Sequence, residues 1–132
     1  MKTHRRAAAL SACVLACIAL PAIAADRVRA GQWVGSWTDG KTTRATSSCL
    51  SKADADAMNG DAKSIRTYLE KTIPPSICQL TDIKVNGDKV SYTATCGAAG
   101  VRSNTTTYHG DSMESVDSQG AKSEGKRVGA CT

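Results

Sequence analysis

The residues most able to do chemistry are four cysteines, Cys49, Cys78, Cys96 and Cys131. An even number of thiols in a small chain suits either disulfides or a metal site. The intervals between them are 29, 18 and 35 residues, and His109 is the only histidine beyond residue 24. Zinc sites are built from closely spaced ligand pairs, which this pattern lacks. The spacing therefore predicts two disulfides and no bound metal.

His109 is the one candidate for acid–base catalysis. A free imidazole titrates near ~6.5, and Asp111 follows two residues later. A catalytic pair would also need a nucleophile, and a histidine in a turn beside Gly110 is usually solvated. Asp54 and Asp56 are two residues apart, so they cannot share a helix face. The sequence predicts no catalytic residue and no cofactor, and it favours a non-enzymatic protein.

Aromatic side chains are few, with two Trp, three Tyr and no Phe in the chain. Trp33 and Trp37 alternate around Gly35, so both project from one face of an expected strand. Tyr92 projects from a second expected strand. Such side chains either supply the bulk of a core or form an apolar binding face for a small ligand, and the sequence leaves both interpretations open.

The first 24 residues have the pattern of a secretory signal peptide. A basic start is followed by a low-polarity run at residues 7–20, and Ala22-Ile23-Ala24 places small residues where a signal peptidase reads. An apolar run of about 14 residues is too short for a membrane span, which needs roughly 20. We predict cleavage between Ala24 and Ala25, export to the periplasm or beyond, and no transmembrane span in the mature chain.

Cys17 offers an alternative fate, because Val14-Leu15-Ala16 before it is similar to the site at which a lipoprotein signal is cut. The apolar run continues past Cys17, so we favour cleavage after Ala24. Cleavage there removes three basic side chains and no acidic one, and the net charge falls from +5 to +2. So small a charge gives no support for a nucleic-acid partner. Lys126 and Arg127, the remaining adjacent basic pair, are expected at a solvated strand end.

Residues 25–132 are expected to form a single domain with little apolar bulk. Only 21 of these 108 residues are Ile, Leu, Val, Met, Trp or Tyr. Burial of one large side chain contributes ~2 kcal/mol, whereas ordering the backbone costs ~1 to 2 kcal/mol per residue. Two disulfides, at ~3 to 4 kcal/mol each, would therefore be comparable with the net stability of the domain.

Alternation of apolar and polar residues predicts an antiparallel meander. Residues 32–37 and 42–50 would pair across a turn at Asp39-Gly40, and Asn86-Gly87-Asp88 is the strongest hairpin signal in the chain. After Cys78, five strands are expected, at residues 80–85, 89–96, 101–108, 112–118 and 122–128. The last of these strands are rich in Thr and Ser, so at most one face of the sheet can be covered there.

A helical insertion is predicted at about residues 51–72. Ser51 and Asp54 have the spacing of a capping box, and Asn59-Gly60 is a typical C-terminal stop. Asp61 can cap a second short helix, in which Ile65, Tyr68 and Leu69 share one face. The insertion would pack over one side of the sheet.

Hairpin geometry suggests how the cysteines pair. If the turn centres on Gly87, residues whose numbers add to about 174 face each other, and Cys78 and Cys96 satisfy this condition. Cys49 and Cys131 would then join the first hairpin to the last strand. Because bulges shift such pairing by one or two residues, a disulfide between Cys49 and Cys78 remains an alternative.

The order of several segments is similar to that of one family. The segments are Gly31-Gln32-Trp33, residues 49–54, Cys78-Gln79-Leu80-Thr81-Asp82, Val85-Asn86-Gly87, residues 92–96, residues 108–112 and residues 125–131. Together they resemble the bacterial exported family called domain of unknown function 3617, over nearly all of the mature chain. The resemblance implies an exported, periplasmic protein and carries no activity or ligand. Residues 115–119 depart from the Met- and Gly-rich late region of that family.

The sequence as a whole predicts a mainly β protein, a curved antiparallel meander or half-barrel stapled by two disulfides, with a short helical insertion. The leading functional hypothesis is an exported, non-enzymatic protein that binds a small apolar ligand or associates with the cell envelope. Two alternatives remain. One is a small hydrolase or enzyme inhibitor that uses His109, and the other is a structural protein that pairs with an envelope protein through its sheet edge.

Overall fold

The structure is a computed structural model that describes residues 26–132. The expected signal peptide, its cleavage between Ala24 and Ala25, and the alternative at Cys17 lie outside the described residues.

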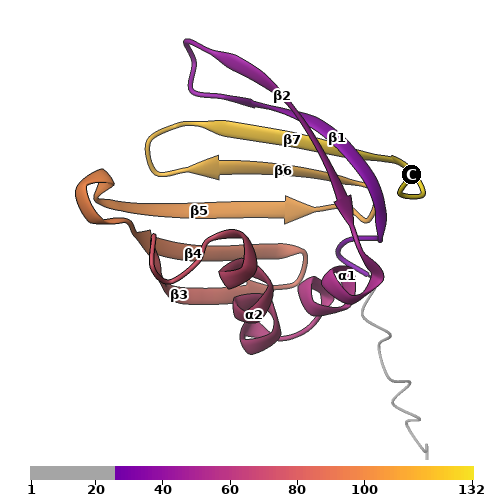
Figure 1. The fold of residues 1–132 in the computed structure, drawn as a ribbon, viewed down its shortest axis with the longest axis horizontal. Coiled ribbons are helices and arrows are strands. Elements are labelled where there is room, and N and C mark those ends of the chain that lie inside the picture. The colour runs from indigo at the N-terminus through magenta and orange to yellow at the C-terminus, as the bar shows by residue number, and fades with distance from the viewer. Residues whose placement is uncertain (1–25) are drawn as a thin grey trace, which may run out of the picture.

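Seven antiparallel strands form one curved, open sheet (Figure 1). Their order across the sheet is β2-β1-β7-β6-β5-β4-β3, so β2 and β3 are the edges. The predicted mainly β fold with a helical insertion is confirmed. The sheet is curved, but its edge strands do not pair with each other, so it does not close into a barrel. The strands are β1 (Gly31–Thr38), β2 (Thr43–Leu50), β3 (Gln79–Asn86), β4 (Lys89–Thr95), β5 (Val101–Tyr108), β6 (Ser112–Asp117) and β7 (Lys122–Gly129).

Strands β3 to β7 form the predicted meander. The hairpin of β3 and β4 turns at Gly87, whose φ of 57° suits glycine. The open end of this hairpin has the predicted register, since Gln79 lies opposite Thr95. The register shifts between Thr81 and Lys84, where Asp82 has a φ of 51°. Because of this bulge, the residues between it and the turn pair one residue away from the predicted register.

The N-terminal hairpin joins the sheet beside the last strand. β1 pairs with β2 along its whole length and with β7 from Gln32 to Thr38. At Gly35, an added Cβ would lie 1.9 Å from the backbone oxygen of Glu124, so only glycine allows the two strands to approach this closely. Local sequence patterns do not predict the pairing of β1 with β7, because 84 residues separate Thr38 from Lys122 in the chain.

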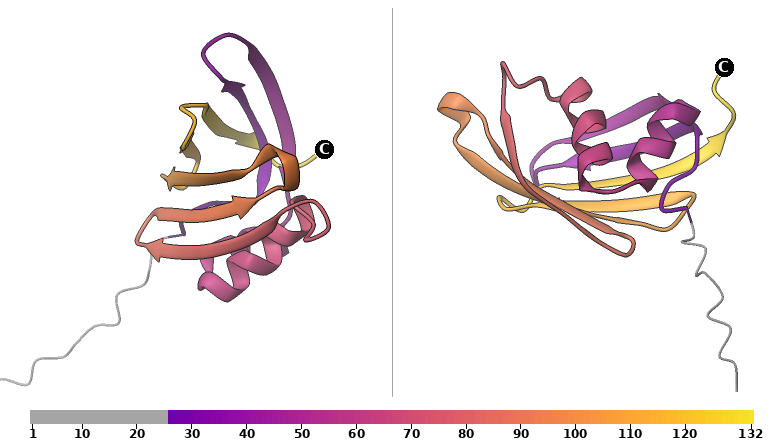
Figure 2. Two further views of the ribbon diagram at one scale, coloured as in Figure 1. Left: turned by 90° about the vertical axis from the view of Figure 1, so that its left-hand side faces the viewer. Right: turned by 90° about the horizontal axis from the view of Figure 1, so that it is seen from below.

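Two helices occupy the insertion, α1 (Lys52–Asn59) and α2 (Ala62–Thr72). The side chains of Ser51 and Asp61 cap them, accepting hydrogen bonds from the backbone N–H groups of Asp54 and Ser64. The helices lie within the concave side of the sheet (Figure 2). Their buried side chains are Ala55, Met58, Ile65 and Leu69.

Both predicted disulfides are present. Cys49 bonds to Cys131 with a Cα–Cα distance of 5.5 Å, and Cys78 bonds to Cys96 with a distance of 4.1 Å. The alternative bond between Cys49 and Cys78 is therefore excluded. Two disulfides in a chain of this size indicate an oxidising environment.

A short segment before β1 ties the helices to the sheet, which the sequence does not reveal. The Arg27 guanidinium donates to the backbone oxygens of Met58, Gly60 (3.1 Å) and Gly87 (2.8 Å). The Asn59 side chain exchanges two hydrogen bonds with the backbone of Val28, at 3.0 and 2.8 Å. The C-terminal end of α1 is thereby held against the turn between β3 and β4.

In the part of the chain that the structure describes, neither helix has the length and apolarity needed to cross a bilayer.

Candidate functional site

The concave face of the sheet has two unlike halves. Over β3 and β4 it carries Leu80, Val90 and Ala94, which the buried side chains of α2 cover. Over β5, β6 and β7, Thr106, Ser115 and Ser123 lie opposite one another in register, and Asn104 lies two residues before Thr106 on the same face of β5. Two adjoining cavities lie between the concave face and the helices.

The first cavity has a volume of ≈ 140 Å³ and lies between α1, α2 and the N-terminal hairpin. Its wall is mainly apolar and includes Trp33, Met58, Tyr68, Tyr108 and Met113. Trp33 is 7% exposed and Met58 is 3% exposed, so these parts of the wall are buried. Val34, Thr46 and Ser48 on the hairpin side are exposed, so the cavity is open to solvent there.

The second cavity has a volume of ≈ 230 Å³ and shares Met58, Tyr68, Tyr108 and Met113 with the first. The two cavities therefore adjoin. The second extends over β4 to Tyr92 and over β5, β6 and β7 to the polar side chains. Together they fall in the lower part of the ~300 to 1,000 Å³ range of small-molecule sites.

Three polar side chains form a hydrogen-bonded cluster in the wall of the second cavity. The Thr106 and Ser115 hydroxyls lie 3.0 and 3.1 Å from Oδ1 of Asn104, to which they donate, and 3.2 Å from each other. Thr106 is the one buried polar residue of the described chain, at 9% exposure. The N–H donors on Nδ2 of Asn104 take no part in this cluster.

No charged side chain lines either cavity within residues 26–132. Three tyrosines contribute to the walls, and burial raises the pKa of Tyr68, Tyr92 and Tyr108, with the strongest shift at Tyr108. Desolvation penalises a phenolate, so these side chains stay neutral at physiological pH. The site is therefore uncharged throughout.

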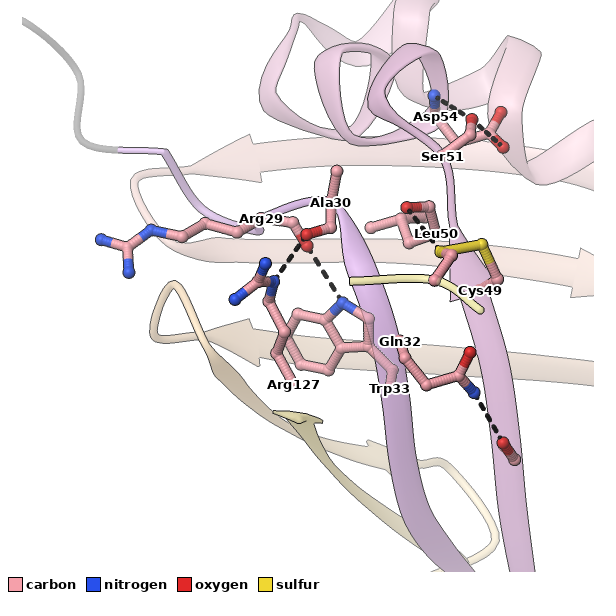
Figure 3. The surroundings of a disulfide bond; sticks show 11 residues. Arg29, Ala30, Gln32, Trp33, Cys49, Leu50, Ser51, Asp54 and Arg127 are labelled. Atoms are coloured by element: carbon pink, nitrogen blue, oxygen red, sulfur yellow. Dashed lines mark hydrogen bonds between the residues drawn. A yellow bond between two sulfur atoms is a disulfide. The ribbon is translucent and has the colours of Figure 1, made fainter. Parts of the chain in front are cut away.

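Trp33 is held in place by contacts with the segment before β1 (Figure 3). Its indole N–H donates to the backbone oxygen of Arg29 at 3.0 Å. The neighbouring Arg127 on β7 donates through Nε to the backbone oxygen of Ala30 at 2.6 Å. Lys126 is exposed, as expected for a strand end. Arg127 is only partly exposed; it pairs with Trp33 in the regular register of β1 and β7, just before the bulge.

The three aromatic residues singled out in the sequence are distributed unequally. Trp33 lines the first cavity and Tyr92 lines the second. Trp37 lines neither of them; it is partly exposed, and the Arg44 guanidinium lies 5.8 Å from its ring centroid, a cation–π contact. Because the tip of the β1–β2 hairpin extends beyond both helices (Figure 1), nothing covers Trp37 as α1 and α2 cover the core.

The sequence did not single out the other members of the wall. Met58, Tyr108 and Met113 come from α1, β5 and β6, which are far apart in the chain. Strand alternation shows that Tyr108 and Thr106 share a face, but it cannot show which face lies under the helices. The polar cluster was therefore indistinguishable from solvated Thr and Ser.

His109 and Asp111 do not form a pair that could act in catalysis. The His109 side chain is 55% exposed, and its Nε2 lies 4.0 Å from Oε1 of Glu114. The Asp111 carboxylate bonds to Arg29 at 2.6 Å. The carboxylates of Asp54 and Asp56 accept hydrogen bonds from the ammonium groups of Lys71 and Lys52 at the helix surface. Both contacts are solvent-exposed ion pairs.

Metal-binding groups of three or more His, Cys, Asp or Glu side chains do not occur within residues 26–132.

Comparison with known proteins gives a family. The family described as "Protein of unknown function (DUF3617)" matches residues 28–131. The chain belongs to this family. The match begins at the segment that ties α1 to the sheet and ends at Cys131, so it includes both disulfides and every residue of the two cavities. Neither the curated proteins nor the solved structures give a match to the chain.

Proposed function

We propose that this member of the DUF3617 family is an exported, periplasmic, non-enzymatic protein that binds a small apolar ligand between α1, α2 and the concave face of the sheet. The observation that carries the proposal is the pair of adjoining cavities with an uncharged, largely apolar wall. Buried apolar pockets with a few polar groups are the usual form of small-molecule sites.

Two further observations support this proposal. The walls come from α1, α2 and six of the seven strands, all except β3, so the site depends on the whole fold. The disulfides indicate an oxidising compartment, which agrees with export through the predicted signal peptide. The apolar ligand would enter from water, and burial of its surface would contribute ~25 cal/mol per Å².

The two tryptophans provide the test of binding, because one lies in the site and the other does not. The Trp37→Phe variant retains Trp33 as its only tryptophan, and the Trp33→Phe variant retains Trp37. We expect decanol to change the fluorescence of the Trp33-only protein in a saturable way and to change that of the Trp37-only protein much less. Equal responses, or none from either protein, would contradict the proposal.

Export is tested separately by the intact mass of the protein recovered from a periplasmic extract. We expect the mass of residues 25–132 with four hydrogens lost to the two disulfides. A mass that retains residues 1–24, or that carries lipid at Cys17, would contradict cleavage between Ala24 and Ala25.

A further inference from the structure

The site has a polar end as well as an apolar end, and the two cavities that contain them share part of their walls. Trp33 marks the apolar end, and the cluster of Asn104, Thr106 and Ser115 marks the polar end. A wholly apolar ligand would displace water from the Nδ2 donors of Asn104 without giving them a hydrogen-bond partner, and a polar group that loses water in this way is costly.

The chemistry of the cluster defines the group that it can receive. Oδ1 of Asn104 accepts from both hydroxyls, so the Nδ2 donors are the part of this amide left for a ligand. The oxygens of Thr106 and Ser115 also keep lone pairs that can accept. The cluster therefore offers both a donor and acceptors, which suits a hydroxyl or a carbonyl group.

Charge excludes the ionised head groups. No Arg, Lys, Asp or Glu lines the cavities within residues 26–132, so neither a carboxylate nor an ammonium group would find an opposite charge there. Moving an unpaired ion into such a site costs several kcal/mol. A neutral head group loses far less on leaving water, and hydrogen bonds to the cluster compensate that loss.

We infer that the ligand is a small neutral amphiphile, whose apolar body lies against Trp33 and whose hydroxyl or carbonyl group bonds to Asn104, Thr106 and Ser115. This inference rests on the proposed function and specifies its ligand. Tyr108 and Met113 lie between the two ends, since each lines both cavities, and would contact the middle of such a molecule.

Three probes with the same chain length test the inference: decanol, decanoate at neutral pH, and decane. Binding is followed by Trp33 fluorescence in the Trp37→Phe background. We expect decanol to bind at least tenfold more tightly than decanoate, because the carboxylate has no cation to pair with. If none of the three binds, the proposed function itself fails. If decanoate binds as tightly as decanol, the inference fails while the proposed function stands.

A matched pair of substitutions tests the role of the cluster. Thr106 and Thr105 are neighbours on β5 that face opposite sides of the sheet, so Thr106→Val and Thr105→Val make the same chemical change inside and outside the site. We expect Thr106→Val to weaken decanol binding by about three- to tenfold, the effect of one hydrogen bond. We expect it to leave decane binding unchanged, and Thr105→Val to alter neither.

Ser115→Ala guards against misfolding of the Thr106 variant, because Ser115 is only partly buried. It is expected to reduce decanol binding in the same range. Retained decane binding shows in each variant that the apolar end is intact. An unchanged ratio of the decanol and decane affinities in both variants, whether the two affinities fall equally or not at all, would overturn the inference.

Discussion

The two ends of the sheet are stabilised in different ways. At one end, α2 packs on β3 and β4 through Ile65 and Leu69, and the Arg66 guanidinium donates to the backbone oxygen of Leu80 at 2.7 Å. At the other end, β2 is almost fully exposed along its length. A disulfide from Cys49 to Cys131 holds it to the C-terminal segment (Figure 3).

The two edge strands of the sheet, β3 and β2, also differ in how regular their pairing is. The β3 edge is interrupted by the bulge at Asp82, which is a common protection against pairing with another chain. The β2 edge pairs with β1 without a register shift and has no such interruption. Side-chain packing together with a short-range disulfide secures the β3–β4 end of this small sheet, whereas the β2 end depends on a long-range disulfide.

The largest expected effect distinguishes the two disulfides. Cys49 and Cys131 are separated by 82 residues, and Cys78 and Cys96 by 18. Loop-closure entropy then gives stabilisations of ~4.5 and ~3 kcal/mol. We expect the double variant Cys49→Ala/Cys131→Ala to lose more unfolding free energy than Cys78→Ala/Cys96→Ala, measured by urea denaturation without reductant. The reverse order would show that packing, rather than cross-linking, dominates at both ends.

The next effect concerns the side chains at the two ends. Ile65 is 0% exposed, and Ile65→Ala should lower the unfolding free energy by ~2 to 5 kcal/mol, since it leaves a cavity in the core. Trp37→Ala removes a larger side chain but should cost less, because Trp37 is already partly hydrated. Thr67→Ala on the exposed side of α2 is the control and should change little. A greater loss at Trp37 would contradict the comparison.

The smallest effect is a pH dependence at the start of α1. Hydrogen bonds from Lys71 and then from Ser51 lower the pKa of the Asp54 carboxyl below its ordinary value of 3.8. A lowered folded-state pKa stabilises the protein above that ordinary value, and this contribution is lost as the pH falls through the folded pKa. We expect Asp54→Asn to cost less than ~1 kcal/mol near neutral pH, because the ion pair is solvent-exposed.

The difference between Asp54→Asn and the unmodified protein should disappear in strong acid, where the carboxyl is protonated. Denaturation midpoints measured across that pH range test this expectation. A difference that persists unchanged at the acid end would assign the effect to local helix propensity instead.

Much of the fold could be predicted from local patterns. Alternation located the strands, Asn86-Gly87 located one hairpin, and the distance of Cys78 and Cys96 from Gly87 indicated their bond. These predictions succeeded because hairpin pairing is determined by a turn and by the residues that flank it. The candidate site was predicted less well, since Trp33 and Tyr92 were identified while Trp37 lies outside both cavities.

What the sequence determined by itself is therefore local: the alternation of the strands, the caps of the helices at Ser51 and Asp61, and the bond within the β3–β4 hairpin. Only the tertiary structure decided which face of the meander the helices cover, that β1 lies beside β7, and that Thr106 and Ser115 face a cavity instead of water. The physical reason is that these features depend on contacts between distant segments. Such contacts form only when the whole chain has folded, and no short stretch of residues records them.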